Sequence, residues 1–149
     1  MLSIRDEVSF EKRAAEAHRI RAKYPNRIPV ICEKAPRSDL PVIDKKKFLV
    51  PMNMLVGEFK YIVHKHINQS AQNSGLPLTH EKTIYLFVEN TAPKAGALMQ
   101  EVYEQHVSDD GFLYVEYSSE YTLGALPLPV LLARKQPQQG SRWIEQRRR

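Results

Sequence analysis

The sequence predicts an α+β fold in which a four-stranded mixed sheet is covered by two helices and preceded by a helical extension. Three observations support this prediction. Segments with helix and strand periodicity alternate along residues 2–117. The chain has 149 residues, 42% of them hydrophobic, which suits one core. Its net charge of +5 lies entirely in the last 25 residues, where six residues are basic and one is acidic, so residues 1–124 form a neutral unit.

The first elements are helical. Residues 2–8 are expected to form a short helix, and residues 9–24 an amphipathic one that Ser9 caps and Pro25 ends. Apolar residues recur at helical spacing and predict the buried face of this helix: Phe10, Ala14, Ala17, Ile20 and Tyr24.

Two strands and a long helix follow. Residues 28–34 are rich in β-branched side chains and predict a strand, in which Pro29 indicates a sheet edge or a strand start. Residues 47–51 predict a second strand. Asn53 is expected to cap the next helix. The apolar face of that helix is predicted to comprise Leu55, Val56, Phe59, Ile62, Val63, His66 and Ile67.

The remaining elements complete the sheet. Residues 68–82 are polar and predict a long loop, and residues 83–89 predict a strand that is apolar on both faces and so belongs in the middle of the sheet. Residues 97–107 predict a helix, and residues 109–111 a turn into a last strand at 112–117. Two strands, a helix, a strand, a helix and a strand form the element order of a β-grasp.

Composition argues against several classes of protein. The single cysteine, Cys32, excludes an internal disulfide and a multi-thiolate zinc site. It lies mid-strand without a histidine motif, and no nucleophile-elbow, Walker or dinucleotide glycine pattern occurs, so we expect no enzyme, no metal and no cofactor. The neutral residues 1–124 argue against a nucleic-acid partner. No apolar run spans a membrane or resembles a signal peptide, which predicts a cytoplasmic protein.

Residues 125–149 differ from the rest of the chain. They contain Pro127, Pro129 and Pro137, a Gln/Gly/Ser stretch and no sustained periodicity. We therefore expect an appendage rather than part of the fold, with a boundary between Gly124 and Ala125.

Three stretches resemble a known family. FEKRAAEAHRIRAKYPNRIPVICEKA, IDKKKFLVP and DGFLYVEYSSEYTLG are similar to the autophagy-related ubiquitin-like modifiers, which include the GABA-receptor-associated protein and the light chain 3 of microtubule-associated proteins. The similarity covers residues 10–124. It implies a helical extension at 1–26, a ubiquitin-like domain at 27–124 and a propeptide-like tail at 125–149 that is removed.

The resemblance also implies a route of modification. In this family a cysteine protease cuts after a glycine, and activating and conjugating enzymes transfer its carboxylate to phosphatidylethanolamine. The matching residue here is Gly124. Glycine suits this role because it lacks a Cβ and lets an extended chain enter a narrow groove. The simpler interpretation is that Gly124 ends a strand or forms a turn.

The resemblance further implies binding of autophagy receptors with an aromatic-x-x-aliphatic motif, added as a strand along residues 47–49. The implied aromatic pocket comprises Glu16, Ile20, Pro29, Lys47, Leu49 and Phe112. The implied aliphatic pocket comprises Phe48, Val50, Pro51, Met54, Phe59, Ile62 and Val63. Exposed charges expected to attract acidic flanks are Arg27, Lys45, Lys46 and Lys47. The simpler interpretation is that the helical apolar stripes are core and the lysines a solvated face.

Some features depart from the family pattern. Leu123 stands where an aromatic residue is frequent, Asn53 where aspartate is frequent, and the loop 68–82 and the tail are longer than usual. Two alternative functions remain open: an unconjugated peptide-binding adaptor, or a protein associated with microtubules or an anionic surface. Lipidation would place the modifier on the autophagosome membrane.

Overall fold

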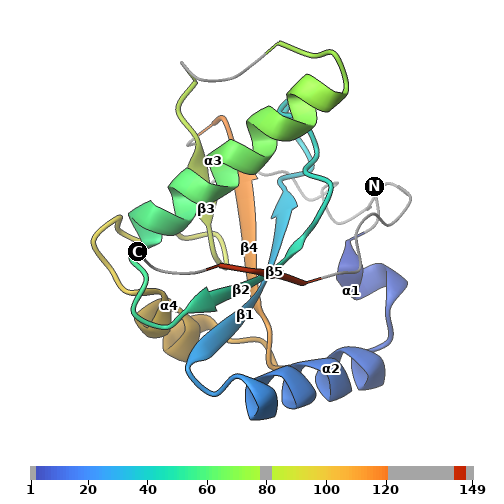
Figure 1. Ribbon diagram of the computed structural model, residues 1–149, viewed down its shortest axis with the longest axis vertical. Coiled ribbons are helices and arrows are strands. Elements are labelled where there is room, and N and C mark those ends of the chain that lie inside the picture. The colour runs from blue at the N-terminus through green and yellow to red at the C-terminus, as the bar shows by residue number, and fades with distance from the viewer. Residues whose placement is uncertain (1–2, 78–81, 121–142, 147–149) are drawn as a thin grey trace.

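The computed structural model describes residues 3–77, 82–120 and 143–146. Its sheet has the strand order β3-β4-β1-β2-β5 (Figure 1). The elements are α1 (Ile4–Glu7), α2 (Phe10–Lys23), β1 (Arg27–Lys34), β2 (Lys47–Pro51), α3 (Val56–Asn73), β3 (Tyr85–Phe87), α4 (Met99–His106), β4 (Leu113–Ser118) and β5 (Trp143–Glu145).

Strands β1 to β4 form the predicted mixed sheet. β1 pairs with β2 antiparallel and with β4 parallel, and β3 pairs with β4 antiparallel. The predicted β-grasp architecture is therefore confirmed. The fifth strand was not predicted: β5 pairs with β2 in parallel, along the edge of the sheet. The prediction that residues 125–149 lie wholly outside the fold is wrong for this segment, because three of its residues extend the sheet.

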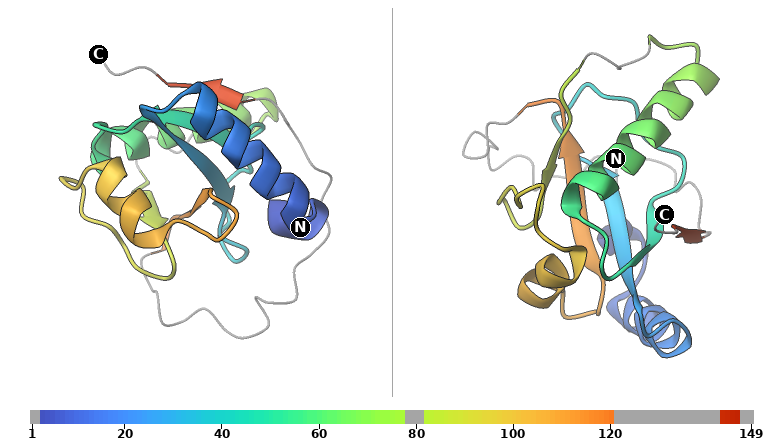
Figure 2. Two further views of the ribbon diagram at one scale, coloured as in Figure 1. Left: turned by 90° about the horizontal axis from the view of Figure 1, so that it is seen from below. Right: turned by 60° about the vertical axis from the view of Figure 1, so that its left-hand side comes forward.

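The two faces of the sheet carry different helices. Val30 and Cys32 of β1 belong to the main core beneath α3 and α4, whereas Ile31 belongs to a smaller cluster beneath α1 and α2. This alternation is the two-residue period of a strand. In the left view of Figure 2, β1 runs between α2 and α4. A sheet covered on both faces explains why β1 is apolar at five consecutive buried positions.

Helix α2 begins as predicted. The Ser9 hydroxyl accepts a hydrogen bond from the Lys12 amide at 3.3 Å, and Ala17 and Ile20 are buried. The prediction that Phe10 lies on the buried face is wrong, because its side chain is 45% exposed in the first turn of the helix. The Arg13 guanidinium lies 5.8 Å from its ring centroid and covers part of the ring.

Helix α3 differs from its prediction at both ends. Leu55, not Asn53, is its N-cap residue, and the Glu58 carboxylate accepts the Leu55 amide at 2.9 Å. The helix continues to Asn73, so the predicted loop begins too early. Ala71 is fully buried one turn after Ile67, which extends the apolar stripe into the polar stretch. No helix in the described parts of the chain is long and apolar enough to cross a membrane.

Two positions in the sheet also differ from prediction. β3 is an edge strand of three residues rather than a central strand. It is apolar on both sides because Leu86 faces the main core while Phe87, on the opposite side, is only 7% exposed. β1 is central, so Pro29 marks a strand start and not an edge. Parallel pairing with β4 begins one residue later, at Val30, so the missing amide of Pro29 interrupts no bond to that strand.

A buried ion pair holds α2 against β4. The Asp110 side chain is fully buried and accepts from Arg13 Nε at 2.9 Å, from the Phe112 amide at 2.9 Å and from the Tyr114 hydroxyl at 2.5 Å. It lies beside Gly111, whose φ of +95° favours glycine. A Cβ on Gly111 would lie 3.0 Å from the Ala17 Cβ, so the turn also needs glycine to let α2 approach.

The same guanidinium reaches α1. Arg13 Nη1 donates to the carbonyl of Arg5 at 2.9 Å and to that of Val8 at 2.8 Å. One side chain therefore joins α1, α2 and the start of β4.

Two carboxylates face each other across β1 and β4. Glu33 and Glu116 are register partners in the parallel pair. Burial raises the pKa of both, and the charge of Glu33 raises that of Glu116 further. The Lys46 ammonium, 3.2 Å from the Glu33 carboxylate, opposes the rise in the pKa of Glu33. The pair is thus a point of like-charge repulsion within the sheet.

We predict that Asp110→Asn lowers the free energy of unfolding by about 3 kcal/mol, because it leaves the buried Arg13 charge unpaired. Urea denaturation followed by circular dichroism measures this loss. The matched control is Asp109→Asn, which changes the exposed neighbouring carboxylate. An equal effect of the two substitutions would contradict the assignment.

We predict that Glu116→Gln raises the free energy of unfolding at pH 7 by about 0.5–1 kcal/mol. A carboxyl whose pKa is raised by folding lowers stability once it ionises, so wild-type stability falls as pH rises from the ordinary glutamate value through the raised one. The difference between variant and wild type should therefore vanish below about pH 4. Denaturation curves from pH 3.5 to 7 measure this, with exposed Glu120→Gln as the control. A gain that persists unchanged at pH 3.5 would refute the electrostatic explanation.

Candidate functional site

The outer edge of β2 carries a pocket that holds an aromatic side chain. The Trp143 indole stacks on the Phe112 ring, with centroids 5.6 Å apart and planes 26° apart. Its Nε1 donates to the Glu16 carboxylate at 2.8 Å. The Lys47 ammonium lies 5.6 Å from the indole centroid. Apolar, hydrogen-bonding and cationic groups therefore all contact one tryptophan.

The walls of this pocket come from two elements and the segment before a third. Glu16 lies on α2, Lys47 begins β2, and Phe112 precedes β4. Lys47 Nζ donates to both oxygens of the Glu16 carboxylate at 3.0 Å, which joins the helix to the strand edge. Helix α2 is held in place by the Arg13–Asp110 pair on the same side of the sheet.

The structure brings together most of the aromatic-pocket residues named from the sequence. Glu16, Lys47 and Phe112 contact Trp143 directly. Leu49, 2% exposed, is the register partner of Glu145. Ile20 and Pro29 are also buried. The exposed fractions of Leu49, Ile20 and Pro29 refer to the chain in which β5 pairs with β2.

Main-chain pairing aligns β5 with β2. The register joins Lys47 to Trp143, Phe48 to Ile144 and Leu49 to Glu145. The amide that follows β5, that of Gln146, donates to the Leu49 carbonyl at 2.8 Å. The edge predicted to receive an extended peptide therefore binds an extended segment of the same chain.

Ile144 lies on the opposite face of the sheet from Trp143. It packs against the main core, whereas Trp143 packs against the smaller cluster around Phe112. The residues named for an aliphatic pocket lie mostly inside the core: Phe48, Val50, Phe59 and Val63 at 0% exposure and Met54 at 2%. Ile62 and Pro51 are partly exposed. Most of these residues are therefore core residues that lie beneath the β2 edge and do not line an open pocket.

Three of the four charged residues named for the edge form ion pairs, namely Arg27, Lys46 and Lys47. Arg27 Nη2 lies 3.0 Å from the Glu145 carboxylate, and Nη1 donates to the Gln146 carbonyl. Lys45 is partly exposed. Lys46 contradicts the expectation of an exposed charge: it is 2% exposed and pairs with Glu33. The three consecutive lysines do not reveal in the sequence that Lys46 is buried, because its partner Glu33 lies in β1.

The residue proposed for cleavage lies outside the described residues. Gly124, its neighbour Leu123 and residues 125–142 belong to the part of the chain that the structure does not describe. Their roles stay predictions.

Sequence reasoning missed Trp143, Ile144 and Glu145. The signal was the only tryptophan of the chain, followed by an aliphatic and an acidic residue within a polar stretch. The third residue after Trp143 is Gln146, so the segment does not match an aromatic-x-x-aliphatic motif. Its significance emerges from the pairing with β2.

Other candidate sites are weaker. The Cys32 thiol is fully buried in β1, and burial raises its pKa well above the ordinary value, which disfavours the reactive thiolate. Among the described residues, no three His, Cys, Asp or Glu side chains are grouped to hold a metal ion.

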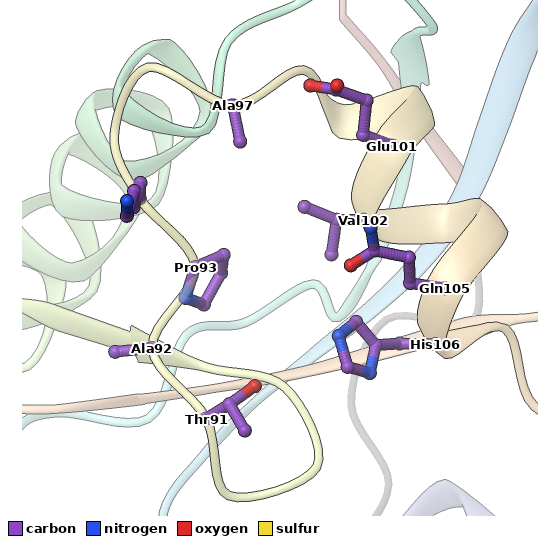
Figure 3. A pocket seen from close by; sticks show the side chains of 9 residues that line it. Thr91, Ala92, Pro93, Ala97, Glu101, Val102, Gln105 and His106 are labelled. Atoms are coloured by element: carbon purple, nitrogen blue, oxygen red, sulfur yellow. The ribbon is translucent and has the colours of Figure 1, made fainter.

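A hollow of about 300 Å³ lies between α4 and residues 91–97, away from the β2 edge (Figure 3). Figure 3 shows Val102, Gln105 and His106 of α4 facing Thr91 and Pro93 of the loop. The lining includes none of the site residues named from the sequence.

Comparison with known proteins identifies the family. The family model described as autophagy protein Atg8, ubiquitin-like, matches residues 12–124. The chain is 53% identical to Autophagy-related protein 8 of Mycosarcoma maydis over 124 residues, which cover 83% of this chain and 98% of that protein. It is 49% identical to Autophagy-related protein 8 of Schizosaccharomyces pombe, over 82% of this chain and 93% of that protein.

Solved structures agree with this result. A Plasmodium falciparum Atg8, in complex with a P. falciparum Atg3 peptide, is 67% identical with a TM-score of 0.72, over 80% of this chain and 98% of that one. Trypanosoma brucei ATG8 is 31% identical with a TM-score of 0.70, over 79% and 94% respectively. The family model spans most of α2, all of α3 and α4 and the strands β1 to β4, whereas α1 and residues 125–149 lie outside it. The chain belongs to the Atg8 family of ubiquitin-like autophagy proteins.

Proposed function

We propose that this chain is a ubiquitin-like modifier of autophagy that a cysteine protease cleaves after Gly124. Activating and conjugating enzymes then join the new carboxylate to phosphatidylethanolamine on autophagosomal membranes. The β2 edge of the anchored protein recruits receptors that carry aromatic-x-x-aliphatic motifs. The protein itself is not an enzyme, and it is cytoplasmic until it is lipidated.

The observation that carries this proposal is the end of the family match. The match stops at Gly124, the residue at which the neutral domain gives way to the basic, proline-containing tail. The end of the family match and the change in composition both support cleavage after this glycine. A terminal glycine carboxylate is unhindered, which favours thioester formation and transfer to an amine.

The geometry of the β2 edge supports receptor binding. β5 demonstrates that this edge accommodates an extended segment in parallel, with an aromatic side chain held by Glu16, Lys47 and Phe112. Strand addition of this kind derives affinity from the main chain and specificity from side-chain pockets. A receptor peptide is proposed to use the same hydrogen-bonding groups of Lys47 and Leu49.

A conjugating enzyme is supported as a partner by the comparison. The similar P. falciparum Atg8 was solved with a peptide of Atg3. At 67% identity, we propose that this chain binds a conjugating enzyme of the same type. A covalently attached two-chain lipid would give stable membrane anchoring to a protein whose described helices do not span a bilayer.

A second candidate is an adaptor that binds peptides without being conjugated. β5 favours it, because residues 143–145 are built into the sheet and would be lost on cleavage after Gly124. The two functions differ in the mass of the protein in cells.

We predict that starved cells that express this chain contain a detergent-extractable species that ends at Gly124 and carries phosphatidylethanolamine. Intact mass spectrometry identifies both the end and the lipid. Gly124→Ala should abolish this species and leave only the full-length chain of about 17.2 kDa, because the substitution adds a Cβ at the cleavage site.

The matched control is Gly140→Ala, which changes a tail glycine beyond the cleavage site and should leave processing unchanged. A lipidated species in Gly124→Ala would overturn the assignment of the cleavage site. The full-length chain alone in wild-type cells would overturn the modifier and favour the adaptor.

We predict that Lys47→Ala with Leu49→Ala weakens binding of a synthetic acidic peptide with an aromatic-x-x-aliphatic motif at least tenfold, a loss of about 1.4 kcal/mol. The two substitutions remove the ammonium and the apolar wall of the pocket. Calorimetry measures the affinity in a full-length Trp143→Ala background, so that the tryptophan of β5 does not fill the pocket.

Tyr61→Ala with Lys65→Ala is the control, because both side chains are exposed on α3. Thermal melting verifies that each variant is folded. Unchanged peptide affinity in the Lys47 and Leu49 variant would remove the β2 edge from the proposal, whereas intact lipidation of that variant would separate receptor binding from conjugation.

A further inference from the structure

The β2 edge of the full chain is occupied by residues 143–146. Three kinds of contact hold this segment. Trp143 stacks on Phe112 and donates to Glu16, the main chain pairs with β2, and the Glu145 carboxylate pairs with Arg27. These contacts use the aromatic pocket, the free strand edge and the flanking cation together, which are the three features of the edge that could select a peptide.

We propose that residues 143–146 are a built-in ligand that closes the β2 edge until the tail is removed. This inference rests on the proposed function, in which the same edge receives receptor peptides. Cleavage after Gly124 would detach the segment from the domain. Processing would then open the receptor site and expose the conjugation carboxylate in one step, so that an unprocessed chain would bind receptors more weakly than a processed one.

The segment formed by residues 143–146 is not part of the family match. It lies outside residues 12–124, which the family model matches. Its contacts are nevertheless directed at specific groups, because Glu16 accepts from the indole at 2.8 Å while it also binds Lys47. The parallel register of three residue pairs fixes the direction in which the segment runs.

Attachment to the same chain makes a weak ligand sufficient. Residues 121–142 connect the segment to the domain, and tethers of modest length give effective concentrations on the order of 1 mM. A segment whose intrinsic dissociation constant is about 0.1 mM would therefore occupy the edge about nine-tenths of the time. The apparent affinity for a free peptide falls by the vacant fraction, which gives about a tenfold loss.

The composition of the segment favours displacement by a better ligand. Gln146 stands where a receptor motif has an aliphatic residue, and the sequence on either side of the segment is basic, with Arg142 before it and three arginines at 147–149 after it. Arg27 and Lys47 of the edge carry the same sign of charge. A peptide with acidic flanks has the complementary charge. The segment is thus strong enough to exclude weak partners when tethered and too weak to compete once it is released.

Fluorescence polarisation tests the proposal with a labelled peptide of residues 141–149, SRWIEQRRR, as the probe. Full-length Trp143→Ala should bind this probe about tenfold more tightly than the full-length wild type. The matched control is Arg134→Ala, a tail substitution outside β5, which should behave as the wild type. Thermal melting establishes that the variants are folded.

Equal affinity of the three chains for the probe would overturn the proposal, and so would the absence of binding to all of them. A charge exchange adds a second criterion. Glu145→Arg and Arg27→Glu should each lower the occupancy of the edge and shift the Trp143 emission to longer wavelength, and the two substitutions together should restore the wild-type emission, because the pair at 3.0 Å is re-formed with reversed signs. Failure of the double variant to restore the wild-type emission would also contradict the proposal.

The only tryptophan of the chain gives a readout that needs no substitution. A tryptophan-free acidic peptide with a Phe-x-x-Leu motif should displace Trp143 and shift its emission to longer wavelength as the indole enters water. Binding of that peptide without any shift would show that residues 143–146 do not occupy the β2 edge of their own chain, and it would leave the proposed receptor site intact. Failure of the same peptide to bind Trp143→Ala would instead overturn the receptor site. In that case the SRWIEQRRR probe still tests whether residues 143–146 occupy the edge of their own chain.

Discussion

The buried ion pair between Arg13 and Asp110 is the constraint on which the pocket depends. It fixes α2 against the beginning of β4, and Glu16 lies one helical turn further along α2. At that position Glu16 reaches Lys47 on the strand edge and the indole of Trp143. The ion pair therefore helps to set the position of the helix that forms one wall of the pocket. A buried pair of this kind contributes geometry more than net stability.

Much of the fold could be predicted because its signals are local. The range 47–51 coincides with β2, and the Ser9 cap is where the sequence places it. The errors arise where distant residues decide. Polar residues continue α3 because Ala71 meets the core. Lys46 turns inward because its ammonium donates a hydrogen bond to the Glu33 carboxylate in β1. Neither partner is visible in the periodicity of its own segment.

For the site, the residues that line the aromatic pocket could be predicted, whereas the segment that occupies it could not. The aromatic-pocket residues came from the resemblance to a family, and Glu16, Lys47 and Phe112 do contact a tryptophan. That this tryptophan belongs to the same chain could not be predicted. Glu16 and Trp143 are separated by 127 positions, and a three-residue strand has too little periodicity to be recognised. Identifying the residues that line the pocket therefore does not identify the segment that binds in it.

The parallel strand β5 has a consequence for how the protein behaves at high concentration. An unpaired strand presents a row of amide and carbonyl groups that is a template for another chain, and sheets with such edges tend to aggregate. At one end of the sheet β3 has only three residues, and at the other β5 covers the longer β2. A chain that keeps β5 therefore carries its own edge protection. The segment whose tryptophan fills the pocket thus leaves an outer edge of three residues in place of the five residues of β2.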